Sequence, residues 1–185
     1  MTINQSIFKP IMRPVYHRDR GRHIAEGKTL VLHCHHFAAL TTQLANDCSL
    51  LNAKKLLAEC AEDAFHTVLT DYYRLNGVGD LKERIWAAER YFSECGLGKL
   101  KVSFAGVCSG EVKLLSSHVD EGWVKKWGVS LAPVNYIGCG YVTALFSAVF
   151  DKPKRFYSAK ERQSIACGAP VSVITVTDAM DRRGN

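Results

Sequence analysis

Helical spacing of apolar positions recurs in four stretches of this 185-residue chain. Apolar residues three and four positions apart lie on one face of a helix, and they predict helices over about 37–48, 53–74, 81–92 and 142–150. Asp80, with Glu83 three residues later, gives the third helix a capping-box-like start. Gly138 and Gly140 stand before the fourth helix and allow that end to approach another element or a ligand closely.

Three other stretches are typical of strands. Residues 101–107 and 111–116 predict a hairpin joined through 108–110, and the β-branched run 171–177 predicts the last strand. This order predicts an α+β fold, an antiparallel sheet with packed helices. We expect an N-terminal arm over 1–28, irregular but apolar enough to pack, and a single domain over 29–180.

Charge and cysteine content narrow the class of protein. The net charge is +6 with a pI near 9.0, and much of the excess lies in the N-terminal arm. No nucleic-acid-binding motif accompanies it, so we favour a solvated or ligand-steering arm, and we expect a small-molecule partner rather than nucleic acid. Seven cysteines without a C-x-x-C pair, a signal peptide or a membrane-spanning run predict a cytoplasmic chain with no membrane partner.

The run His33-Cys34-His35-His36 is the densest group of nucleophiles and bases, and it lies at the predicted start of the first helix. A cysteine activated there by a histidine and by the helix N-terminus could attack a polarised carbon, and zinc or another divalent metal could bind the histidines instead. The alternative is a polar cap whose imidazoles bond backbone groups.

Two further residues are candidates for catalysis. Cys139, between two glycines before the fourth helix, could project its thiol into a pocket with a pKa lowered by the helix dipole; alternatively it is a small residue in a tight turn. Glu161 could act as a general base or orient a histidine, or be a surface charge between Lys160 and Arg162.

The C-terminal half carries a longer pattern: Gly140-Tyr141 opening an apolar helix, a turn at Lys152-Pro153, and Glu161-x-x-Ser164-x-Ala166-x-Gly168 leading to Ser172. It resembles the 4-vinyl-reductase domain, a small-molecule-binding module. In the zinc-bearing members three cysteines and a glutamate hold the metal. Those cysteines fall on Asn135, Ser164 and Ser172 here, and only Glu161 is kept, so the resemblance implies the fold and the pocket but argues against that zinc, and we expect no cofactor.

The N-terminal half adds a shorter likeness. Ala39-Leu-Thr-Thr-Gln-Leu-Ala-Asn-Asp47 is similar to the first helix of the wider superfamily that includes vesicle-tethering subunits. This likeness leaves open a scaffold role, in which helices form a homodimer.

Size, thiol content, the 4-vinyl-reductase-like half and the histidine–cysteine cluster together resemble the small bacterial L-2-amino-thiazoline-4-carboxylate hydrolases. That resemblance implies opening of a cyclic thio-amidine to N-carbamoyl-L-cysteine, with Cys139 or an activated water as nucleophile and with Cys34, His33, His35, His36 and Glu161 assisting. We expect substrate contacts from Asn135, Tyr141, Ser172, His118 and Trp123. The alternative is a non-catalytic sensor or carrier domain. The hydrolase hypothesis requires Cys139, His35 or His36, and Glu161 to converge in one cleft.

Overall fold

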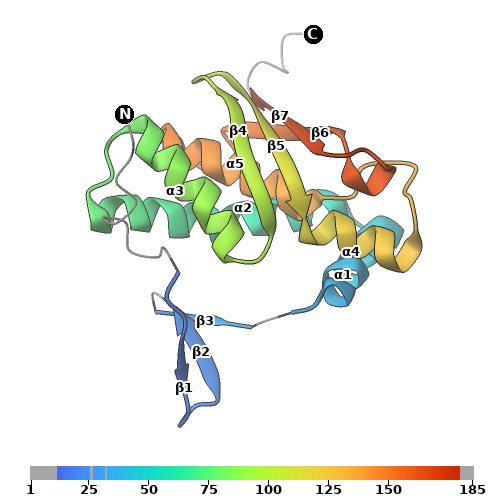
Figure 1. Cartoon of the computed structure of the whole chain (residues 1–185). Coiled ribbons are helices and arrows are strands. Elements are labelled where there is room, and N and C mark those ends of the chain that lie inside the picture. The colour runs from blue at the N-terminus through green and yellow to red at the C-terminus, as the bar shows by residue number, and fades with distance from the viewer. Residues whose placement is uncertain (1–11, 26, 32, 180–185) are drawn as a thin grey trace.

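The computed structural model describes residues 12–25, 27–31 and 33–179. Within these residues a four-stranded antiparallel sheet has the order β4-β5-β7-β6, formed by β4 (Gly98–Ala105), β5 (Ser109–Ser117), β6 (Tyr157–Gln163) and β7 (Ser172–Asp178). Helices cover one face of this sheet (Figure 1). The predicted α+β class is therefore confirmed.

Buried and exposed residues alternate along the strands, which explains why helices cover one face of the sheet. Inward positions such as Leu100, Val112, Leu114, Ile174 and Val176 are buried, whereas the residues between them face solvent or are half-buried. An antiparallel sheet with one apolar face needs one helical layer. Helix α5 (Tyr136–Val149) packs against β6 and β7 and is buried along nearly its whole length.

Three other helices match predicted stretches: α1 (His35–Asp47), α2 (Ala53–Asn76) and α3 (Leu81–Glu94). Helix α4 (His118–Trp127) was not among the helices predicted from apolar spacing, and a short 3-10 turn η1 (Ile165–Cys167) precedes β7. Asp80 caps α3 as expected, its carboxylate accepting hydrogen bonds from the N–H groups of Lys82 and Glu83. Helix α2 lies against α5, and α1 lies against α4. None of the described helices is long and apolar enough to span a bilayer.

The fourth predicted helix begins earlier than its apolar spacing indicates. Asn135 caps α5 by accepting a hydrogen bond from the N–H of Gly138, so both glycines lie inside the first turns of the helix instead of before it. The expected close approach is real: a Cβ on Gly140 would lie 2.1 Å from the carbonyl oxygen of Ala58 in α2. Glycine at this position therefore permits the tight α2–α5 contact.

The N-terminal region departs from the expected irregular arm. Strands β1 (Val15–His17), β2 (Arg22–Ala25) and β3 (Lys28–Leu30) form a small antiparallel sheet that stands apart from the main sheet (Figure 1). Part of the predicted arm, residues 1–11, lies outside the described residues, as do residues 26 and 32. Met12 packs against the end of α3, where its N–H donates to Glu94 Oε2 at 2.9 Å.

Candidate functional site

A pocket of about 720 Å³ opens between the first half of α2, the first half of α5 and β6. Its walls are mainly apolar, and charged side chains stand among them. Three of the predicted site residues line it: Asn135, Cys139 and Glu161. Other lining residues come from α2 (Lys54, Lys55, Ala58, Glu59, Glu62), α5 (Tyr136, Gly140, Thr143) and the β6 region (Arg155, Tyr157, Ser158, Ala159, Lys160).

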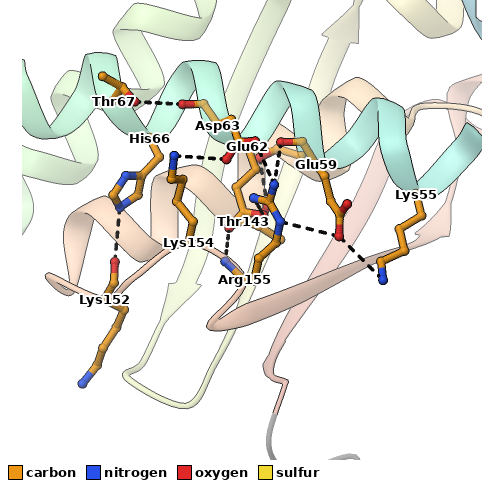
Figure 2. Close-up of polar contacts among 11 residues, drawn as sticks. Lys55, Glu59, Glu62, Asp63, His66, Thr67, Thr143, Lys152, Lys154 and Arg155 are labelled. Carbon is orange, nitrogen blue, oxygen red and sulfur yellow. Dashed lines mark hydrogen bonds and ion pairs between the residues drawn. The ribbon is translucent and has the colours of Figure 1, made fainter.

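One pocket wall is fixed by ion pairs around Arg155, which reaches from the turn before β6 to α2 (Figure 2). Its Nη1 lies 2.7 Å from Glu62 Oε2, and its backbone N–H donates to Glu62 Oε1 at 2.7 Å. Its Nη2 lies 2.9 Å from Asp63 Oδ2. Because the side chain of Glu62 is buried, this pairing holds the turn firmly against α2. The sequence did not predict these ion pairs, because the partners lie more than 90 residues apart.

Beside the pocket lies a buried polar cluster centred on Asn135. Its Nδ2 donates to Ser117 Oγ at 2.9 Å and to Asp120 Oδ2 at 2.5 Å. Ser164 Oγ donates to the other oxygen of Asp120 at 3.1 Å. The N–H of Asn135 donates to Glu161 Oε2 at 3.4 Å, which joins the cluster to the pocket.

Both carboxyl groups of this cluster are poorly solvated. Burial, and then the nearby Asp120, raise the pKa of Glu161 to about 7, although the Ser172 and Ser164 hydroxyls act in the opposite direction. Burial likewise raises the pKa of Asp120, against hydrogen bonds from Ser117, Asn135 and Ser164. Glu161 therefore keeps its proton to a higher pH than an exposed glutamate does. Asp120 was not predicted as a site residue, and it is the central acceptor here.

The four positions implied by the 4-vinyl-reductase resemblance do come together. Asn135, Glu161, Ser164 and Ser172 all lie in or beside the cluster, where Ser172 Oγ accepts from the N–H of Ile165 at 2.9 Å. Their chemistry does not fit zinc, because amide and hydroxyl groups replace the thiolates. Among the described residues, no three His, Cys, Asp or Glu side chains form a group that could hold a metal ion.

Cys139 lines the pocket from the first turns of α5, but its thiol is not activated as predicted. Burial, followed by the charge of Glu161, raises its pKa to about 12. A helix N-terminus stabilises a thiolate and so lowers the thiol pKa, whereas burial destabilises the thiolate and raises that pKa. At Cys139 the effect of burial is the larger of the two. The expected lowered pKa of Cys139 is therefore wrong.

The predicted histidines gather elsewhere, where the N-termini of α1 and α4 meet. The ring centroid of His118 lies 5.5 Å from that of His33 and 6.4 Å from that of His35, and the His35 and His36 rings are 4.4 Å apart. Cys34 is exposed, and backbone N–H groups of Phe37 and His36 lower its pKa. No histidine is among the described residues that line the pocket, so the convergence required by the hydrolase hypothesis is not observed.

Two of the predicted substrate contacts instead have packing roles. Tyr141 is fully buried between Phe65 and Phe92, and its hydroxyl donates to the carbonyl oxygen of Ala88 at 2.6 Å. Trp123 is buried against Val134 and Ala166 in a small second core. Both side chains point into packed interior because their helices bury these faces. Neither is a lining residue of the pocket.

No family model matches the sequence, and no curated protein sequence matches it at a significant level. Solved structures do match the fold. The phenol-responsive sensory domain of the transcription activator PoxR, solved with phenol, has a TM-score of 0.74 at 17% identity, covering 90% of this chain and 85% of that one.

Two further structures share the fold at lower similarity. A vinyl-4-reductase family protein from Methanocaldococcus jannaschii has a TM-score of 0.51 at 13% identity, with 77% of each chain covered. A trafficking protein particle complex subunit 3 from Naegleria fowleri, covalently bound to palmitic acid, has a TM-score of 0.50 at 12% identity, covering 78% of this chain and 94% of that one. The predicted 4-vinyl-reductase-like fold is thus confirmed.

Proposed function

We propose that this chain is a small-molecule-binding domain whose ligand occupies the pocket between α2, α5 and β6. The observation that carries the proposal is the pocket itself, whose volume of about 720 Å³ lies within the range typical of sites for drug-sized ligands. A sensory domain that responds to phenol shares the fold, which supports a ligand-holding role without catalysis. The high pKa of Cys139 also favours binding over nucleophilic chemistry.

The lining indicates what kind of ligand fits. Apolar groups from Ala58, Tyr136 and Ala159 suit a hydrocarbon or aromatic body. Lys54 and Lys160 stand at the same pocket, and neither pairs with a carboxylate within the described part of the chain; Lys54 Nζ instead lies 5.9 Å from the centroid of the Tyr136 ring. We infer an aromatic ligand that carries a polar or anionic group directed toward these lysines.

A ligand panel tests this proposal. Isothermal titration with phenol, benzoate and larger aryl acids should find binders, and the affinity should favour the larger acids. Ala159→Phe, which fills the pocket, should weaken binding at least tenfold, whereas Lys113→Phe on the solvent face of β5 should leave it unchanged. Equal affinity of both variants, or no binder in the panel, would refute the proposal.

Hydrolysis of L-2-amino-thiazoline-4-carboxylate is the second proposal. Its support is Glu161, because a pocket carboxyl with a pKa of about 7 suits general acid–base catalysis. Water would add to the ring carbon between sulfur and nitrogen, and C–S cleavage would give N-carbamoyl-L-cysteine. Chromatography should then show ring opening that Glu161→Gln abolishes and Cys139→Ser spares. A wild-type rate equal to the buffer rate would exclude this activity.

We also propose a homodimer. Helix α1 exposes Phe37, Leu40 and Leu44 on one face, and Leu44 keeps 62% of its surface accessible. A stripe of exposed apolar side chains of this kind is typical of an association surface. Sedimentation should give a dimer that Leu44→Glu dissociates, while Leu75→Glu, at a similarly exposed leucine on α2, should have no effect. A monomeric wild-type chain would contradict this expectation.

A further inference from the structure

Asn135 uses nearly all of its hydrogen-bonding capacity inside the polar cluster. Its Nδ2 donates to Ser117 and Asp120, and its Oδ1 accepts from the N–H of Gly138 at 2.8 Å. Its own N–H donates to Glu161 at 3.4 Å. The side chain is only 2% exposed, so these contacts are shielded from water. An amide can do this because it combines two N–H donors with a carbonyl acceptor.

The cluster joins elements that are distant in the sequence. Ser117 and Asp120 belong to the start of α4, Asn135 to the start of α5, and Ser164 to the turn η1. Ser164 Oγ donates to Asp120 at 3.1 Å and also accepts from the N–H of Ala166. The hydrogen bonds thus fix two helix starts and the β6–β7 connection to one another at the inner side of the pocket.

A metal ion would make the same kind of link in the zinc-bearing proteins that the sequence resembles. Here the donors fit one another rather than a cation: each oxygen of Asp120 already accepts a side-chain hydrogen bond, from Asn135 or from Ser164. A zinc ion at this position would have to displace these bonds, and no three His, Cys, Asp or Glu side chains of the described residues form a group that could hold it.

We propose that this hydrogen-bonded cluster, in which the Asn135 side chain donates to Asp120 and the Asn135 backbone N–H donates to Glu161, replaces the structural metal, so that the chain folds and holds its pocket without zinc. The proposal does not depend on which ligand the pocket binds. It makes Asn135 the positioning residue of the cluster and Asp120 its main acceptor.

A matched pair of variants tests the role of the amide. Asn52 and Asn135 both cap helices, and aspartate normally caps as well as asparagine. Asn52→Asp, at the exposed start of α2, should leave the Tm within about 2 °C of the wild-type value. Asn135→Asp should lower the Tm by about 10 °C or more, because it removes the donor to Ser117 and Asp120 and places a second carboxyl group against Asp120.

Metal analysis provides the second measurement, which does not depend on whether a variant folds. The purified full chain should contain well below one equivalent of zinc by mass spectrometry, and its Tm should be unchanged by a strong chelator. Stoichiometric zinc that the chelator removes with a fall in Tm would overturn the proposal. An Asn135→Asp variant that melts with the wild type would overturn it as well.

Discussion

Replacing Glu161 with glutamine removes a carboxyl group that the folded chain holds with an unusually high pKa. Glu161 is 6% exposed, and its pKa is raised from 4.5 to about 7. The difference, at roughly 1.36 kcal/mol for each pH unit, amounts to about 3 kcal/mol. Below pH 4.5 both the folded and the unfolded chain bind this proton. Between pH 4.5 and about 7 only the unfolded chain releases this proton, so the free energy of unfolding falls over that interval and levels off once the folded chain ionises as well.

Urea denaturation between pH 5 and pH 8 measures this effect. The wild-type free energy of unfolding should fall by up to about 3 kcal/mol over the range, and Glu161→Gln should remove most of that fall, with Asp120 contributing the remainder. Glu59→Gln is the control, because Glu59 lines the same pocket but keeps 32% of its side-chain surface accessible. A Glu161→Gln variant that keeps the full wild-type pH slope would refute the reasoning.

Three other predictions follow from contacts described above. Gly140→Ala should lower the free energy of unfolding by about 1–3 kcal/mol, since a Cβ would lie 2.1 Å from a backbone oxygen of α2; urea denaturation checks this. Arg155→Ala should cost about 3 kcal/mol by leaving the buried Glu62 carboxylate without its guanidinium, and an equally stable variant would contradict it. Iodoacetamide at pH 8 should alkylate Cys34 well before Cys139, because the pKa of Cys34 is lowered and that of Cys139 is raised to about 12. Peptide mass mapping over time measures which of the two cysteines is alkylated first.

Local patterns predicted much of the helical layer. The second and third helices were predicted from apolar spacing, and Asp80 fixed the start of the third. Strand β6 was not predicted individually, because its sequence Tyr-Ser-Ala-Lys-Glu-Arg-Gln has little apolar alternation at the edge of the sheet. The start of α5 was missed because glycines normally oppose helix formation, and only the packing against α2 reveals why they are present.

The site was predicted in part, and the reason lies in sequence separation. Asn135, Cys139 and Glu161 were singled out and do lie at the pocket. Asp120 was overlooked because its partners are 15 and 44 residues away, a distance over which no periodicity carries information. The histidines were predicted as site residues because they form a dense local motif. In the structure the N-terminus of α1 lies beside α4, so these histidines are away from the pocket.

The strand order of the main sheet affects how readily the protein aggregates at high concentration. Its outermost strands are β4 and β6, and both carry exposed cationic side chains. These are Lys99 and Lys101 on β4, and Lys160 and Arg162 on β6. A strand from a second molecule that tried to extend the sheet would have to desolvate this charge and meet the same charge on its own edge. Growth into fibrillar stacks is thereby disfavoured.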